Sequence, residues 1–235
     1  MRPQLTYCRS GDFGDSWAEV RCAIEGPIAA VRRNVAPNGR LGISLRLSAR
    51  TLRELLASGA RAELEFVLER HQLYVFKLDA HDHHPDWLEH ARLAYTCRAA
   101  DLLASLVPEG LIGSMSTVPG AHGDRAHIRG ARHSAARRLL AAAAHFADIE
   151  ARTGRRIFLS IEPEPGYMLE GAFDTVSFFR DHVFHGDALR GARIDERTAR
   201  RHIGVCLVAF DKPLDALATL EREGITVTRQ TAEAA

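Results

Sequence analysis

The chain has 235 residues, of which 46% are hydrophobic and 26% charged, and this balance excludes intrinsic disorder over most of its length. Lys and Arg number 31 against 30 Asp and Glu, giving a formal charge of +1, so no overall field directs the protein to nucleic acid or acidic lipid. No apolar run approaches the roughly 20 residues that cross a bilayer, and residues 1–17 lack the apolar core of a signal peptide. We therefore expect a cytoplasmic protein with no membrane or nucleic-acid partner.

The first half of the sequence alternates short extended segments with segments of helical spacing. Residues 41–48 alternate with period two, and β-branched and aromatic residues dominate 72–79, as is typical of strands. Pro85 and Asp86 stand where a helix over 85–107 would begin. The expected elements are a strand at 5–8, a helix at 17–33, a strand at 41–48, a helix at 51–71, a strand at 72–79 and a helix at 85–107.

The second half continues this alternation. Pro119 and Gly120 end a strand, Gly154 is a typical helix C-cap, and Asp174 is a candidate N-cap. The expected elements are a strand at 111–119, a helix at 131–153, a strand at 155–165, helices at 175–184 and 195–202, a strand at 203–210, a helix at 213–224 and a strand at 225–231.

Strands separated by helices predict a parallel sheet, either open and doubly wound or closed as a barrel. The first strand–helix turn, residues 9–16, has no G-x-G-x-x-G and no P-loop, which disfavours a dinucleotide-binding sheet. A complete (β/α)₈ barrel takes about 250 residues. We therefore expect one α/β domain over residues 1–235, a parallel (β/α) TIM-like barrel that is shortened at its C-terminal end. Its open edge predicts a homodimer or a partner protein that covers it.

Polar residues follow several predicted strands, where barrel enzymes place their chemistry. Carboxylates and imidazoles that converge there suit a divalent ion, with Mn, Mg, Zn and Fe as candidates. The residues concerned are Arg46, Ser48, Asp79, Ser114, Ser116, Thr117, Glu162, Glu164, Asp211, Lys212, Arg229 and Gln230.

A histidine-rich segment, 81–84, follows the strand at 72–79. Because imidazole binds metals and carries protons near neutral pH, His81 and His84 are candidate proton carriers, and His81 is also a candidate metal ligand. The alternative is a solvated loop with no role, because loops collect polar residues.

Glu162 is the sharper candidate. It ends the apolar run 157–161, where an unpaired carboxylate would be costly to bury. Either a metal ion or an arginine, for instance Arg46, would compensate its charge, and the residues alone leave both open.

Two other features carry no functional weight at this point. The four cysteines have no C-x-x-C spacing and are expected to be buried thiols. The basic run 129–138 belongs to a composition in which Arg far outnumbers Lys, which indicates coding bias rather than a binding surface.

Several stretches, covering most of the chain, stand in the order known from one protein family. They are LTYC…SW (5–17), GISLRLSAR (42–50), LYVF (73–76), PDW…RLAYT…AADLLASLVPEG (85–110), GSMSTVPG (113–120), EPEPGYMLE (162–170), TVSFFRDH (175–182) and RRHIGVC (200–206). In these stretches the chain resembles the EboE family, metabolite-traffic proteins with a xylose isomerase-like TIM barrel.

This resemblance implies that Glu162 is a divalent-metal ligand, joined by Asp and His ligands from later strands. After GVC the family pattern is Y-D-x-C-H, and here Val208 stands at the Asp position and Asp211 at the His position. A metal held by Glu162 and Asp211 alone would have too few protein ligands for tight binding, unless a histidine of 81–84 contributes, and His81 is our candidate.

Three functions stay open, one of which is a structural subunit that assembles through the open edge of the sheet. The first is a metal-assisted isomerase or epimerase of secondary metabolism acting on a small polar metabolite. In it Glu162 and Asp211 hold the ion, His81 or His84 moves a proton, and Arg46 neutralises developing charge. The alternative is a non-catalytic metabolite-binding or trafficking protein with a degenerate metal site, which the replaced ligands favour.

Overall fold

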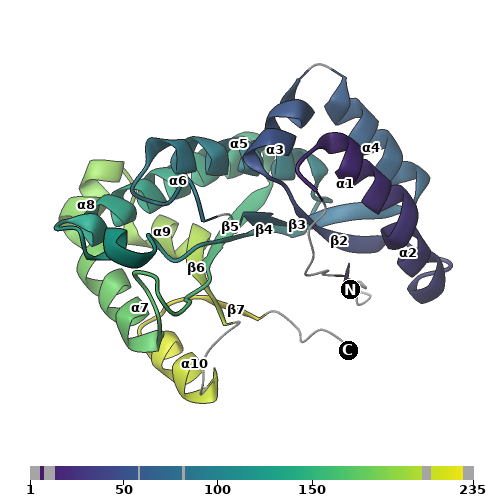
Figure 1. Ribbon diagram of the computed structural model, residues 1–235. Coiled ribbons are helices and arrows are strands. Elements are labelled where there is room, and N and C mark those ends of the chain that lie inside the picture. Colours follow the sequence, from purple (N-terminus) through teal and green to yellow (C-terminus); the bar gives the residue numbers. More distant parts are fainter. Residues whose placement is uncertain (1–5, 8–13, 58, 81–82, 208–212, 230–235) are drawn as a thin grey trace.

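The computed structural model describes residues 6–7, 14–57, 59–80, 83–207 and 213–229. Its strands form one sheet in chain order, and every neighbouring pair is parallel. The strands are β1 (Thr6–Tyr7), β2 (Leu41–Arg46), β3 (Leu73–Ala80), β4 (Ile112–Thr117), β5 (Arg156–Ile161), β6 (Ile203–Leu207) and β7 (Val227–Arg229). The sheet curls into a half-barrel, so the predicted incomplete TIM-like barrel is confirmed (Figure 1).

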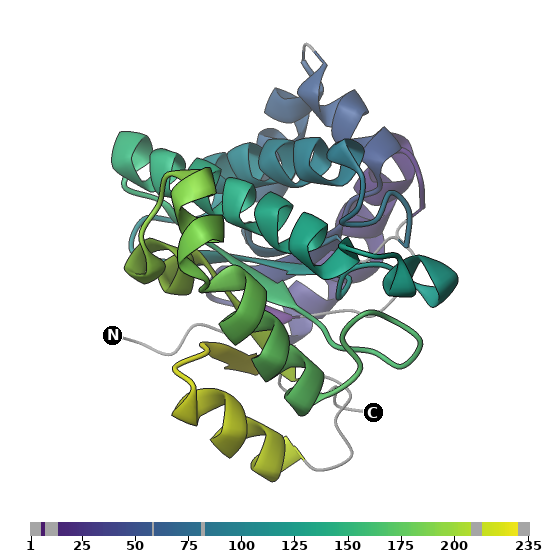
Figure 2. The same ribbon diagram turned by 90° about the vertical axis from the view of Figure 1, so that its left-hand side faces the viewer.

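Helices lie outside the curved sheet and leave its concave side to face the open part of the barrel (Figures 1 and 2). They are α1 (Trp17–Ala23), the π-helical turn η1 (Ile24–Ile28), α2 (Ala29–Val35), α3 (Ala49–Leu56), α4 (Ala60–Arg70), α5 (His90–Leu106), the 3₁₀ turn η2 (Gly123–His127), α6 (Ala131–Thr153), α7 (Ala172–Phe178), the π-helical turn η3 (Phe179–Val183), α8 (Gly186–Ala192), α9 (Glu196–His202) and α10 (Pro213–Arg222). Among the described residues, no helix is long and apolar enough to span a bilayer.

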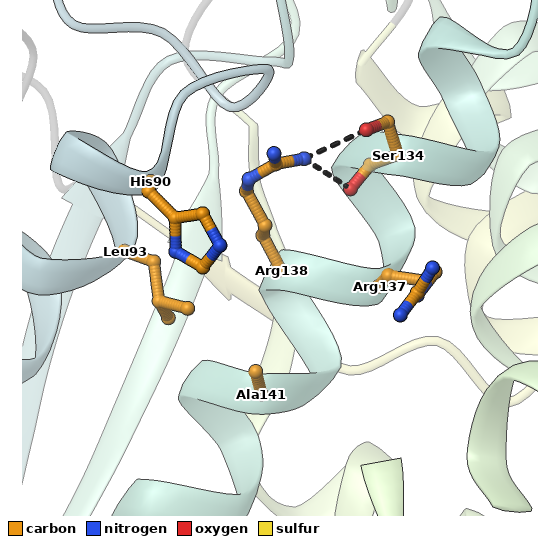
Figure 3. Close-up of a pocket in the computed structure, with 6 residues that line it drawn as sticks. All are labelled: His90, Leu93, Ser134, Arg137, Arg138 and Ala141. Atoms are coloured by element: carbon orange, nitrogen blue, oxygen red, sulfur yellow. Dashed lines mark hydrogen bonds between the residues drawn. The ribbon is translucent and has the colours of Figure 1, made fainter. Parts of the chain in front are cut away.

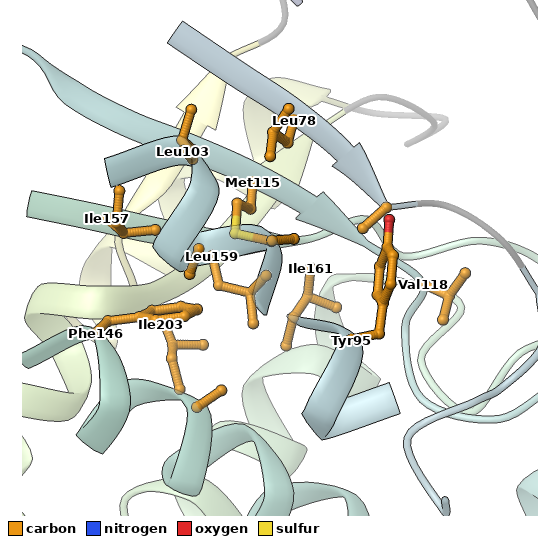
Figure 4. Packing of buried hydrophobic residues seen from close by; sticks show 14 of the residues in the cluster. Leu78, Tyr95, Leu103, Met115, Val118, Phe146, Ile157, Leu159, Ile161 and Ile203 are labelled. Atoms are coloured by element: carbon orange, nitrogen blue, oxygen red, sulfur yellow. The ribbon is translucent and has the colours of Figure 1, made fainter. Parts of the chain in front are cut away.

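The main core lies between the helices and the convex face of the sheet. Phe146 of α6 and Leu103 of α5 pack on the central strands, and both are fully buried (Figure 4). A Cβ atom on Gly113 of β4 would lie 3.0 Å from the Leu103 side chain, so the glycine lets α5 approach the sheet closely. The strand residues of this core include Leu78, Met115, Ile157, Leu159, Ile161 and Ile203.

Three predicted helices differ from the observed ones. The expected helix 51–71 is two helices, since Gly59, at φ +94°, turns the chain between α3 and α4. The helix expected from 85 begins at His90 instead, because the Asp86 side chain accepts a hydrogen bond from the Leu88 amide (2.8 Å) in a turn that precedes it.

Asp174 does not cap the helix expected at 175–184. That helix begins at Ala172 after Gly171, and Asp174 lies in its first turn, where it pairs with Arg132 of α6 at 3.4 Å. Helix α8 was not predicted. By contrast, α6 ends at Gly154 in the left-handed conformation, as predicted.

Candidate functional site

The concave face of the sheet is polar along its central strands. Side chains alternate between the two faces of a strand, so the residues flanking the helix-facing Leu78, Met115 and Leu159 point to the concave side. The pairing register aligns them in two rows. The first row is Ser44, Lys77, Ser114 and Phe158, and the second row, nearer the C-terminal ends of the strands, is Arg46, Asp79, Ser116 and Ser160.

Glu162 meets Lys77 of the first row. The Lys77 Nζ lies 3.6 Å from Glu162 Oε1, and the two side chains are only 10% and 13% exposed. The Glu162 amide donates to the Thr117 carbonyl at 3.1 Å, which continues the β4–β5 pairing and fixes where the carboxylate starts. A carboxylate and an ammonium therefore face each other across β4 in a largely water-excluded position, where charges interact strongly.

Two hydrogen bonds join the second row to its neighbours. Ser116 donates to Asp79 Oδ1 at 3.3 Å, and the Ser160 hydroxyl lies 2.7 Å from that of Thr228 on β7. Gly204 is the β6 residue paired with Ser160, and a Cβ there would lie 2.6 Å from the Phe158 ring. The glycine thus lets the Phe158 ring lie against β6.

The structure places the predicted site residues in different surroundings, and two of them lie outside the part of the chain that it describes. Glu162 lies in the pair with Lys77, so a lysine compensates its charge, and a contact with the suggested Arg46 stays a prediction. Arg46 ends β2 opposite Asp79 in the register, half-buried. His84 lies exposed in the loop after β3. His81 and Asp211 lie outside the described residues.

His84 belongs to a cluster in that loop. Its ring and the carboxylates of Asp86 and Glu89 offer atoms within 4.8 Å of one another, a spacing that a metal ion can use. Arg125 of η2 already occupies both carboxylates, with Nε 2.6 Å from Asp86 Oδ2 and Nη2 3.2 Å from Glu89 Oε1. This guanidinium bonds both carboxylates and offsets one of their two negative charges, so the described cluster is an ion pair that ties the loop to η2, and a metal ion there would have to displace Arg125.

The pKa of Asp86 reflects this pairing. Its side chain is 1% exposed, and burial by itself raises the pKa. The hydrogen bonds from Arg125 and the Leu88 amide, with the charges of Arg125 and His84, outweigh burial and hold the pKa below its ordinary value. Asp86 is therefore a carboxylate throughout the physiological range.

Three aromatic side chains gather where the loops after β3, β4 and β5 meet. The Tyr167 hydroxyl is hydrogen-bonded to His83 Nδ1, and the His122 ring packs edge-on against Tyr167 with centroids 4.8 Å apart. Burial, followed by the charge of Glu164, raises the pKa of Tyr167 to about 12, so this phenol stays protonated. The arrangement provides a proton donor beside two imidazoles.

The same loops are locked together by buried contacts. Trp87, fully buried, donates from its indole to the Thr117 hydroxyl at 3.0 Å, and the Met168 amide donates to the Ala121 carbonyl at 2.9 Å. The stretches PDW, GSMSTVPG and EPEPGYMLE therefore meet at the C-terminal ends of the strands.

Sequence reasoning missed Lys77, His122 and Tyr167. Lys77 carried a signal, because it interrupts the apolar strand LYVFKLD, where a buried ammonium demands a partner. His122 and Tyr167 carried none, since only the fold brings their loops together.

Comparisons with solved structures support this architecture. A xylose isomerase-like TIM barrel protein from Mycobacterium smegmatis, in complex with magnesium, superposes with a TM-score of 0.58 at 18% identity, over 92% of this chain and 71% of that one. AsbF, a probable 3-DHS dehydratase of petrobactin synthesis from Bacillus anthracis, gives 0.54 at 12% identity, over 94% and 69%. No protein-family model matches the chain, and no curated protein sequence does. The likenesses to solved structures support an incomplete α/β barrel of the TIM type for this chain.

Proposed function

We propose that this chain is an EboE-like member of the xylose isomerase-like barrels that binds a small polar metabolite on the concave face and isomerises or epimerises it. The observation that carries the proposal is the shielded pair of Lys77 and Glu162 at the C-terminal half of the strands. Barrel enzymes work at this end of the sheet, and a base beside a cation is what proton transfer next to a carbonyl requires.

The chemistry suits a hydroxyl-bearing carbon next to a carbonyl. The Glu162 carboxylate removes the proton from that carbon, and the electron pair forms an enediol as the carbonyl oxygen gains charge. The Lys77 ammonium stabilises this oxygen, donates a proton to it and recovers one from the neighbouring hydroxyl. Return of the carbon proton from Glu162 to the adjacent carbon then gives the isomer. For the epimer, Lys77 instead takes its proton back from the former carbonyl oxygen, the neighbouring hydroxyl keeps its own, and the enediol turns over before Glu162 returns the proton to the other face of the original carbon.

A divalent ion was the expected cofactor, with Mn, Zn, Fe and Mg as candidates, and the Mycobacterium structure contains magnesium. The described residues do not fit one at Glu162, because the Lys77 ammonium lies 3.6 Å from its Oε1 and repels a second cation. The proposed proton transfers therefore use only Glu162 and Lys77. Metal analysis of the purified protein tests this point. Stoichiometric metal that is lost in E162Q would contradict it.

The proposal is tested by following solvent deuterium. The full chain is incubated in D₂O with D-xylose, D-fructose and a panel of other aldoses and ketoses, and proton NMR reports exchange at the carbon beside the carbonyl. We expect exchange with at least one sugar, reduced at least about 100-fold in E162Q and K77M. The matched control is E109Q, an exposed carboxylate before the N-terminal end of β4, which should exchange like the wild type.

The alternative, a metabolite-binding or trafficking protein, has one observation in its favour. Glu162, which the sequence predicts to be a metal ligand, forms an ion pair with Lys77 instead. Sugar-induced chemical shifts without deuterium incorporation would support this binder and contradict the enzyme. Exchange in E162Q at the wild-type rate would contradict the roles of the pair.

We also propose that a second copy or a partner protein covers the open half-barrel, because β1 and β7 each pair with only one other strand among the described strands. Light scattering coupled to gel filtration tests the homodimer. A stable monomer would count against it.

A further inference from the structure

A groove of about 260 Å³ lies between α5 and α6, on the outer layer of the half-barrel and separate from the concave face (Figure 3). One face of α6 supplies most of its wall, since the contributing residues recur at helical spacing. The lining residues are His90 and Leu93 of α5 and Ser134, Arg137, Arg138 and Ala141 of α6.

The lining is cationic. Two guanidinium groups and an imidazole line the groove, and none of its lining residues is acidic. Among the described residues, no carboxylate pairs with Arg137 or Arg138. On the same helix, Arg152 pairs with Asp148 at 2.8 Å and Arg132 with Asp174 at 3.4 Å. The groove therefore concentrates uncompensated positive charge.

Hydrogen bonds to Ser134 hold the Arg138 side chain in place and, among the described residues, leave one of its N–H donors unused. Its Nη1 donates to the Ser134 carbonyl at 3.1 Å and to the Ser134 hydroxyl at 2.7 Å, and Figure 3 shows the guanidinium between Ser134 and His90. Its Nε is buried and has no hydrogen-bond partner within the described part of the chain. A buried donor without an acceptor costs free energy, so a small shift of the Arg138 side chain toward an oxyanion in the groove would relieve that cost.

We propose that this groove binds the phosphate group of a small phosphorylated metabolite. Two guanidinium groups match the charge of a phosphate dianion, and the planar fork of arginine fits phosphate oxygens. The volume lies just below the roughly 300 Å³ at which drug-sized pockets begin, so the ligand is small. His90 is the first residue of the 17-residue helix α5, whose N-terminal dipole adds to the positive potential.

Two arginines of the basic run 129–138 thus belong to the proposed phosphate site. Arg137 and Arg138 face the groove, whereas the sequence alone had given the whole run no weight.

The test is calorimetric titration of the full chain with inorganic phosphate, with ribose 5-phosphate, and with ribose and acetate as comparisons. We expect phosphate and ribose 5-phosphate to bind, whereas the heat from ribose, an aldose of the class proposed for the concave face, should be the same in R137M as in the wild type. R137M and R138M should each lower the affinity for phosphate by about tenfold or more. The matched control is R70M, which removes an exposed arginine at the C-terminal end of α4 and should leave phosphate affinity unchanged.

Three results would overturn the site. They are no phosphate binding at 10 mM, equal loss in R70M, and acetate binding as tight as phosphate. Because R138M removes a partly buried side chain, its thermal melt is recorded alongside. If R138M unfolds, R137M decides the question, since Arg137 is exposed and its loss leaves the core intact.

Discussion

The two faces of the sheet are built from alternate residues of the same strands, yet they hold different kinds of side chain. On β3, Leu78 packs into the helix-facing core, while its neighbours Lys77 and Asp79 belong to the concave rows. The convex face gains stability by removing apolar area from water. The concave face holds charges in a position that is costly unless they are paired. The comparison indicates that the convex face stabilises the fold, and it is the reason why the proposed site lies on the concave face.

The largest expected effect tests the convex face. Phe146→Ala removes a fully buried ring between α6 and the sheet and should lower the free energy of unfolding by about 4 kcal/mol. Urea denaturation followed by circular dichroism measures it. The control, Phe66→Ala, truncates a residue that is 65% exposed and should change stability by less than about 0.5 kcal/mol. Equal losses in the two variants would remove the distinction between core and surface.

The next effect tests the concave face. K77M or E162Q alone leaves a shielded charge without its partner and should cost about 3 kcal/mol of unfolding free energy. The double variant removes both charges and should cost clearly less than the sum of the two single changes. A double-mutant cycle in urea measures this coupling. Additive losses would mean that the two groups do not interact in solution.

The fold was predictable because each strand signal was local. The period-two alternation of 41–48 and the stop at Gly154 require no knowledge of distant residues, and β2 and α6 were found where expected. Two of the three helix errors, at Asp86 and Asp174, arose where one carboxylate had two competing uses. Asp86 is a good helix cap in isolation, but its carboxylate is bound by Arg125, which lies 39 residues away.

The candidate site was predictable only in part. Glu162 was singled out by burial alone, because an apolar strand that ends in a carboxylate requires compensation. The identity of the compensating group was not accessible, since it depends on the register that aligns β3 with β5 across β4. The same reason hid the contact of His83 with Tyr167, which joins two loops 84 residues apart.

A smaller loss of stability is expected when the ion pair of Arg125 with Asp86, at the C-terminal ends of the strands, is removed. The pKa of Asp86 is lower in the folded chain than the unfolded value of about 3.9. The stabilisation that Asp86 gives the folded chain is therefore complete above the unfolded pKa and is lost as pH falls through the lower folded pKa. R125M removes the main stabilising hydrogen bonds, so acid unfolding should begin at a higher pH. Circular dichroism between pH 2 and 6 measures this shift, with R70M as control, and an unchanged midpoint would contradict the role of Arg125.

The smallest expected effect concerns the rate at which cysteines are chemically labelled. This rate measures how exposed each face of the sheet is to solvent and requires no change in stability. Cys22 on α1 is exposed, contrary to the expectation of buried thiols, while Cys206 on β6 is 3% exposed. Burial, with the charge of Asp101, raises the pKa of Cys97 to about 11, so at pH 8 only about one thiol in 10³ is ionised there. A maleimide probe followed by peptide mass spectrometry should label Cys22 first and Cys97 and Cys206 far more slowly. Because β6 places Cys206 on the face that carries Lys77 and Glu162, its labelling should slow further when a sugar that undergoes exchange is bound. Labelling of Cys206 as fast as Cys22 would mean that the concave face opens to water, and the shielding on which the proposed chemistry depends would be lost.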